Sequence, residues 1–194
     1  MLKTKIKGLL LKRVSYDDKR KMLAEHGIDI LISDGRNLLC VLILSFFIGN
    51  TKQAVLYMLV LSTLRVHTGG WHSTSELKCF ITYQGMFLFF SLLSLIHIPK
   101  YVSITIIIIS ILYIVLFSPV EHKLNPLSTE EIKRNRVYCY VYCVAYFTLF
   151  LILTSYSYVY AQTIAITFLF NFMLMALLRK SVNYRYYDHK LCNR

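Results

Sequence analysis

Six apolar runs, separated by short polar connections, limit the folds open to this chain. They cover about residues 37–49, 52–66, 80–98, 101–118, 137–155 and 157–178 of the 194. A helix needs about 20 mostly apolar residues to cross the hydrocarbon core of a bilayer. Because 56% of the residues are hydrophobic and only 16% are charged, the pattern predicts an all-α integral membrane protein with about six transmembrane helices and no large soluble domain.

The runs divide a single polytopic membrane domain, 1–194, into three parts. Residues 1–36 combine basic and apolar side chains as an amphipathic helix on an anionic lipid surface does, although a solvated tail fits the same composition. Residues 37–178 contain the spans, and 179–194 form a basic tail. No cleavable signal peptide is expected, because the first apolar run follows a long basic segment.

The net charge of +12 is placed in a way that predicts topology. Nine of the 22 Lys and Arg residues precede the first run, four lie in 119–136 and five follow the last run, whereas the turns expected on the opposite side hold only Lys52 and Lys100. Basic loops stay on the cytoplasmic side of a membrane. We therefore expect both termini and residues 65–79 at the cytoplasmic face of the cell membrane, with membrane lipid rather than nucleic acid as the partner of the charges.

A polar segment, RVHTGGWHSTSELKCF at residues 65–80, separates the second and third runs. Its Cys79 is a candidate nucleophile, because a nearby His or a helix N-terminus stabilises a thiolate. His72 is the nearest strong candidate for the base. On one uninterrupted helix their seven-residue separation corresponds to about 10.5 Å along the axis, too far for a hydrogen bond. A Cys–His pair therefore requires a break in the helix.

Two features of the segment favour such a break. Gly69-Gly70 frees the backbone, and Ser73-x-x-Glu76 matches a capping box that starts a new helix just after His72. Cys79 would then lie in the second turn of that helix, and the imidazole outside it could fold back toward the thiol. Simpler roles stay open: Cys79 as a packing residue, His67 as a competing base, and Arg65 as an ordinary flank of a membrane helix.

A second polar segment covers residues 118–136. Its prolines, Pro119 and Pro126, stop helices, and Ser128-x-x-Glu131 matches another capping box, which leads into the fifth run. Side chains of this segment that could orient His72, as the third group of a triad does, are Glu121, His122 and Asn125. Loop residues of this kind are more often only solvated.

The five cysteines do not form the disulfide framework of a small secreted domain, and their odd number leaves at least one thiol free. Cys139 and Cys143 share one helical face and could supply half of a metal site. Because no second pair of ligands lies near them, we favour packing between membrane helices. We expect no metal and no other cofactor.

Together, Arg65, Gly69-Gly70, His72 and Cys79 form an R-x-x-x-G-G-x-H-x6-C arrangement that resembles the accessory gene regulator B (AgrB) family. The stretch Ser118-Pro119-x-Glu121-x-x-x-Asn125-Pro126 resembles a second segment of the family more loosely. Chain length, multispan hydropathy and the basic segments also fit, so the resemblance covers nearly the whole chain.

The resemblance implies a membrane-embedded cysteine endopeptidase that processes the AgrD propeptide of Gram-positive quorum sensing. By this resemblance, His72 and Cys79 would be the catalytic residues. Arg65 and Gly70 would match motif positions that are also important for activity in the family. The Cys79 thiolate would form a thioester with the propeptide, and a thiol or hydroxyl within the propeptide would attack that thioester to close a ring. The acidic tail of such propeptides suggests binding by basic side chains, here Lys123, Lys133, Arg134 and Arg136.

Two other classes of protein are compatible with the sequence. In a small peptide transporter or exporter, Arg65 and His72 would belong to a polar gate, but transporters usually place ionisable groups near the bilayer midplane. A non-catalytic assembly factor would be favoured if a thiol probe labelled Cys79 no faster than Cys192. The propeptide sequence, the ring size and the existence of a homodimer stay open.

Overall fold

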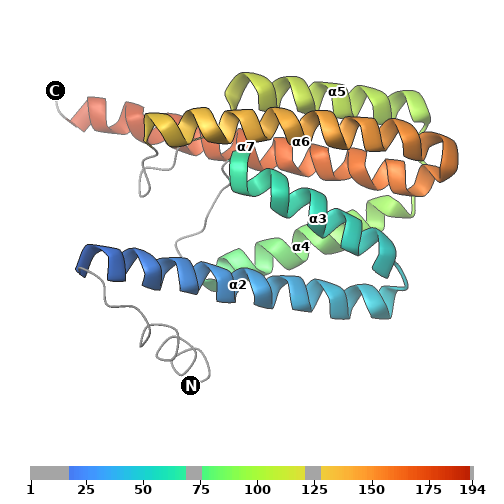
Figure 1. The fold of residues 1–194 in the computed structure, drawn as a ribbon, viewed down its shortest axis with the longest axis horizontal. Coiled ribbons are helices and arrows are strands. Elements are labelled where there is room, and N and C mark those ends of the chain that lie inside the picture. The colour runs from blue at the N-terminus through green and yellow to red at the C-terminus, as the bar shows by residue number, and fades with distance from the viewer. Residues whose placement is uncertain (1–17, 69–75, 121–127, 193–194) are drawn as a thin grey trace.

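The computed structural model describes residues 18–68, 76–120 and 128–192, and six helices lie in this part of the chain. Consecutive helices run in opposite directions, so α3 and α5 end, and α4 and α6 begin, toward the end of the bundle where α2 begins and α7 ends (Figure 1). The helices are α2 (Asp18–Ile48), α3 (Thr51–Thr68), α4 (Glu76–Ser94), α5 (Lys100–Phe117), α6 (Thr129–Tyr156) and α7 (Tyr158–Cys192).

The all-α membrane fold predicted from the sequence is confirmed. Within the described residues, four helices are long and apolar enough to cross a membrane, and their spans are Leu77–Ser94, Lys100–Phe117, Thr129–Tyr156 and Tyr158–Leu177. Helices α2 and α3 contain the first two, shorter apolar runs, and neither has an apolar stretch long enough to count among these four. Apolar side chains on the outer face of α5, such as Ile109 and Leu116, are more than half exposed, as a lipid-facing surface requires.

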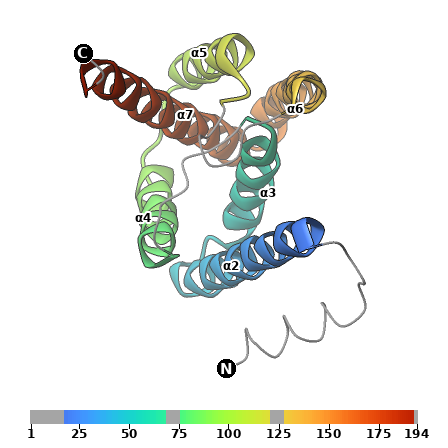
Figure 2. The same cartoon turned by 90° about the vertical axis from the view of Figure 1, so that its left-hand side faces the viewer.

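Helix α7 lies at the centre of the bundle. It contacts α3, α4, α5 and α6, and 67% of its apolar span is buried, against 22–28% for the other three spans. Figure 2 shows α7 between the pair α5 and α6 and the group α2, α3 and α4. Only a helix with packing partners on several sides buries so much of its surface.

Two apolar cores follow from this arrangement. The first joins α3 and α7 to α5 and α6, and includes Leu64, Ile107, Phe150 and Phe168. The second joins α3 and α7 to α2 and α4, and here Tyr57 stacks on Phe90 with 4.4 Å between the ring centroids. Helices α3 and α7 therefore belong to both halves of the molecule.

The helix ends follow local sequence chemistry. Helix α2 ends before Gly49, whose positive φ of 85° suits glycine at the C-terminal end of a helix. The capping box predicted at Ser128 and Glu131 is present: the Ser128 hydroxyl accepts from the Glu131 N–H, and the Glu131 carboxylate accepts from the Ser128 N–H. This cap starts α6 at Thr129, eight residues before the apolar run expected at 137–155.

The first helix extends well beyond its apolar run. Helix α2 begins at Asp18, so the second half of the basic segment 1–36 continues without interruption into the run at 37–49. The residues before Asp18 lie outside the described part of the chain. The binding of this segment to a lipid surface stays a prediction.

Candidate functional site

The described flanks of both polar segments, at the end of α3, the start of α4, the end of α5 and the start of α6, lie toward the same end of the bundle (Figure 1). Helix α3 ends at Thr68, directly before Gly69, and α4 begins at Glu76 and runs in the opposite direction. The chain therefore reverses between Thr68 and Glu76, and the prediction that the helix breaks between His72 and Cys79 falls partly on residues outside the described part of the chain. Gly69, Gly70, His72 and the predicted Ser73 cap lie outside the described residues, so the pairing of the imidazole with the thiol stays a prediction.

Cys79 is the fourth residue of α4 and has a free, half-buried thiol. Tyr83 lies one turn further along the same helical face and is buried at 8% exposure. This tyrosine lies within Coulombic range of Cys79 on its own helix, of Arg65 on α3 and of Asp34 on α2. Arg65 and Cys79, which are fourteen residues apart in the sequence, therefore lie in the same region of the fold, each near enough to Tyr83 to act on its hydroxyl electrostatically.

Helix α3 separates its polar side chains onto two faces. Arg65 lies two turns after Tyr57, within Coulombic range of that ring and on the side of α2 and α4. His67 instead faces α6, where it lies between the rings of Tyr138 and Tyr142, at 4.8 and 5.4 Å between centroids. These contacts hold the imidazole of His67 on the α6 side of α3.

The contacts of His67 include one hydrogen bond. Its Nδ1 lies 3.3 Å from Oδ1 of Asn135, a carbonyl oxygen that accepts from the ring. The side chain is thus engaged by α6 through both stacking and hydrogen bonding. As a competitor of His72 for the role of base, His67 is disfavoured by this placement.

The two polar segments meet at the end of α3. The Val120 N–H donates to the carbonyl of Thr68 at 2.9 Å, and the Thr68 hydroxyl donates to Oδ1 of Asn171 on α7 at 3.4 Å. Arg136 on α6 donates from Nε to the Ser118 carbonyl at 3.3 Å. Thr68, the last residue before the Gly-Gly pair, is therefore bonded to two other parts of the fold, and Arg136 joins α6 to Ser118 next to one of them.

The remaining candidates of the second segment are only partly described. Lys133 and Arg134 lie in the first turns of α6 and are exposed, so they are accessible to a partner outside the bundle. Arg136 is also used within the fold through its bond to Ser118. Glu121, His122, Lys123 and Asn125 lie outside the described residues.

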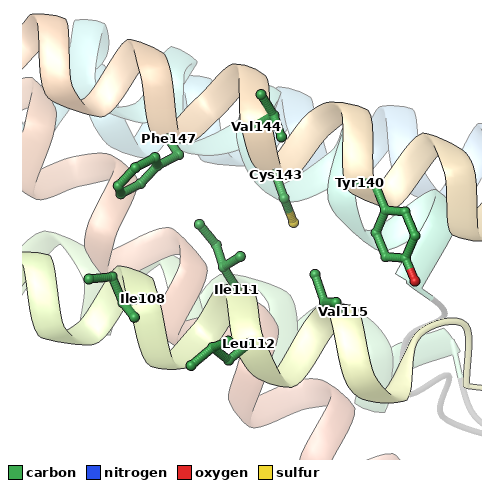
Figure 3. A pocket seen from close by; sticks show the side chains of 8 residues that line it. All are labelled: Ile108, Ile111, Leu112, Val115, Tyr140, Cys143, Val144 and Phe147. Carbon is green, nitrogen blue, oxygen red and sulfur yellow. The ribbon is translucent and has the colours of Figure 1, made fainter.

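The thiols of α6 have a packing role. Cys139 and Cys143 are buried in the core that joins α5, α6 and α7, and Sγ of Cys139 lies 2.9 Å from the Ser118 hydroxyl. Cys143 also lines an apolar groove of about 420 Å³ between α5 and α6 (Figure 3), together with side chains such as Ile111 and Phe147. We find no group of three metal-ligating side chains within the described ranges.

Sequence reasoning missed several residues near Cys79. Tyr83 lies inside the third apolar run, and its four-residue spacing from Cys79 is the one signal that could have identified it. Asn37 and Gln84 also lie in apolar runs, and the Gln84 amide donates from Nε2 to the Asn37 carbonyl at 3.2 Å. A contact between α2 and α4 cannot be predicted from the sequence pattern of either apolar run alone.

The fold and this site define a class, that of small polytopic membrane proteins with a cysteine at the start of a membrane helix. Comparison with known families is specific: the model of accessory gene regulator B matches residues 4–177. The chain belongs to the accessory gene regulator B family.

Individual relatives agree with this assignment. The chain is 27% identical over 145 residues to AgrB-like protein 2 of Clostridium perfringens strain 13, a match that covers 67% of this chain and 66% of the relative. It is 26% identical over 133 residues to an AgrB-like protein of Clostridium perfringens strain SM101, covering 63% and 61%. The chain thus spans somewhat less than two thirds of these curated relatives. No solved structure matches it significantly.

Proposed function

We propose that this protein is a membrane-embedded cysteine endopeptidase that cleaves the C-terminal part of an AgrD-like propeptide and promotes its cyclisation. Membership of the AgrB family supports the class of substrate. The observation that carries the proposal is the reversal of the chain between α3 and α4, which brings Arg65 and Cys79 together around Tyr83.

In the proposed reaction, His72 removes the proton of the Cys79 thiol and the thiolate attacks a peptide carbonyl of the propeptide. The C–N bond then breaks, the nitrogen of the C-terminal fragment takes the proton from the imidazolium, and a thioester joins the propeptide to Cys79. A thiol or hydroxyl within the propeptide next attacks the thioester carbonyl. The ring closes, and Cys79 leaves as a thiol.

Cyclisation competes with hydrolysis of the thioester by water. Cys79 is half-buried at the start of an apolar helix, next to the buried Tyr83. A site that limits water favours attack by the nucleophile tethered within the propeptide. Exposed Lys133 and Arg134 at the same end of the bundle would attract an acidic tail of the propeptide, and positive-inside topology would place this end in the cytoplasm.

The transporter alternative is less well supported. A transport path usually contains ionisable groups at the middle of the spans. In the four candidate spans, the described Asp, Glu, Lys and Arg residues are confined to the helix starts, at Lys78, at Lys100 and from Glu130 to Arg136. The polar cluster around Cys79 also lies toward one end of the bundle.

Mutation of the two proposed catalytic residues tests this function. Cys79→Ala and His72→Ala are each expected to abolish cleavage of the propeptide, because the nucleophile or its base is lost. Membrane insertion should remain unchanged for both. The matched control is Cys40→Ala, another free, half-buried thiol, which should retain full activity. Cleavage that persists in Cys79→Ala would refute the mechanism.

A further inference from the structure

The groove between α5 and α6 opens onto the outer surface of two candidate membrane spans (Figure 3). Two of the side chains that line it, Leu112 and Val144, are more than half exposed. Its lining is apolar apart from the Tyr140 hydroxyl and the Cys143 thiol. A polar ligand therefore finds few partners in the groove, whereas an apolar chain can pack against both helices.

The groove is nearly as long as one leaflet of a bilayer is deep. It extends from Ile108 to Val115 on α5 and from Tyr140 to Phe147 on α6, and each of these separations corresponds to about 10.5 Å along a helix axis. One leaflet of the hydrocarbon core is about 15 Å thick. Since α5 ends at Phe117, the groove occupies the half of the span toward the end of the bundle where α6 begins.

Two basic side chains continue the groove face of α6 toward that end. Arg136 precedes Tyr140 by one turn and Lys133 precedes it by two, so both lie on the helical face that lines the groove. Arg136 also donates from Nε to the Ser118 carbonyl at 3.3 Å, which places its guanidinium beside the end of α5. Because a guanidinium has five N–H donors, this bond leaves others for an anion.

The neighbouring charges at the start of α6 lie away from this face. Glu131 precedes Tyr140 by nine residues, or two and a half turns, so it lies on the opposite side of α6, where it forms the capping box. Glu130 is about 9 Å from Arg136 along the helix axis. Arg134 is rotated by about 120° from Tyr140. The positive charge next to the groove is therefore that of Lys133 and Arg136.

We propose that the groove between α5 and α6 binds one anionic phospholipid of the leaflet at this end of the bundle. An acyl chain lies between the helices, and the phosphate contacts Lys133 and Arg136. Basic sites between membrane helices near the membrane surface suit acidic head groups. Lipid tails are as apolar as the groove itself, so the tail contributes packing and the head group determines which lipid is held. This inference goes beyond the proposed function and does not depend on it.

The first test measures the role of charge. The full-length protein in detergent micelles is titrated with phosphatidylglycerol or with phosphatidylcholine of the same acyl chains, and bound lipid is counted by native mass spectrometry. We expect one phosphatidylglycerol per protein, bound about fivefold or more tightly than phosphatidylcholine, since a single cation near a membrane surface contributes about that factor. Equal affinity for the two lipids would overturn the proposal.

A matched pair of arginines tests the position of the head group. Arg136→Gln should weaken binding of phosphatidylglycerol by about fivefold, whereas Arg134→Gln removes the same charge from another face of α6 and should leave binding unchanged. Lys133→Gln, at an exposed position, should also cost about fivefold and does not disturb the bond to Ser118. Equal losses for Arg134→Gln and Lys133→Gln would show a diffuse attraction and would overturn the site.

A matched pair of valines tests the groove. Val144 lines it and Val141 does not, and both are more than half exposed on α6, so a Trp at either position should be tolerated by the fold. Val144→Trp should weaken binding of phosphatidylglycerol by about tenfold, because the ring fills the space of the acyl chain. Val141→Trp should bind as the wild type does.

Melting temperatures provide a second readout of the same pair. Phosphatidylglycerol should raise the melting temperature of the wild-type and Val141→Trp proteins but not that of Val144→Trp, because a ligand stabilises only the protein that binds it. Equal effects on both Trp variants would overturn the proposal. Dimers that form without lipid and are lost in Val144→Trp would also contradict it, since the groove would then hold a second copy of this chain.

Discussion

At the end of the bundle with the α4–α5 turn, the buried amide of Gln162 makes three hydrogen bonds, whereas in the half nearer Cys79 the buried amide of Asn37 makes none with described residues. Gln162 donates to the carbonyls of Leu93 and Ile96 and accepts from the Ile98 N–H. Tyr158 supports the same turn through a hydrogen bond to the Ile98 carbonyl at 2.6 Å. These bonds hold the end of α4 against α7.

The two regions differ in how completely their buried polar side chains are hydrogen-bonded. The amide of Gln162 satisfies backbone groups that the end of a helix leaves without partners, so its bonds stabilise the fold. Asn37 Nδ2 and Oδ1 and Gln84 Oε1 have no partner among the described residues, and buried polar atoms without partners reduce stability. In the half of the bundle that holds the α4–α5 and α2–α3 turns, Oδ1 of Asn50 and the Tyr57 hydroxyl also lack partners among the described residues.

The largest effect is expected at Gln162. Gln162→Leu removes three hydrogen bonds and leaves backbone groups of the α4–α5 turn without partners, so the free energy of unfolding should fall by about 2 kcal/mol. Denaturant titration in detergent micelles measures this loss. Activity per folded molecule should be unchanged. A Gln162→Leu protein as stable as Asn37→Leu would remove the contrast between the two regions.

A smaller effect is expected where the two polar segments meet. Val120→Pro removes the N–H that bonds the Thr68 carbonyl, so the start of the Gly-Gly connection is less firmly held. We expect about a tenfold loss in kcat/KM, equivalent to about 1.4 kcal/mol, in a propeptide cleavage assay. Val120→Ala, which keeps the N–H, is the control. Equal activity of the two variants would show that this bond does not position the site.

The smallest effect is expected at His67. His67→Phe keeps an aromatic ring between Tyr138 and Tyr142 and loses only the bond to Asn135, so cleavage should change by less than about threefold. The pH dependence of kcat should also keep its shape, because the proposed base is His72. A loss as complete as that of His72→Ala would transfer the role of base to His67.

Hydropathy predicted the helices well but not their full lengths. Each of the six expected runs overlaps one of the described helices, because apolar side chains facing lipid are a strong signal, although the run expected at 80–98 continues past the end of α4 at Ser94. The helical starts of α2 at Asp18 and α6 at Thr129 were missed, since charged residues continue a helix without adding to its hydropathy. Local chemistry filled part of that gap, as the confirmed capping box at Ser128 and Glu131 shows.

The site was predictable only where its chemistry is local in the sequence. The Gly-Gly pair predicted a break in the helix, and the antiparallel α3 and α4 show that the chain reverses between Thr68 and Glu76; the pairing of His72 with Cys79 stays a prediction. The placement of Arg65 beside Tyr83 depends on how α3 packs against α4, and the unpartnered amide of Asn37 depends on α2. Such contacts depend on how helices pack against each other, so the sequence pattern of a single apolar run does not predict them.

The central claim is that Cys79 attacks the propeptide, and intact-mass spectrometry tests it most directly. The protein in vesicles is mixed with the synthetic propeptide, and the reaction is stopped with acid after short times. We predict an adduct of the protein with the N-terminal part of the propeptide, localised to Cys79, cleaved by hydroxylamine as a thioester and absent in Cys79→Ala. Cleaved and cyclised peptide produced equally by wild-type and Cys79→Ala protein would contradict the account.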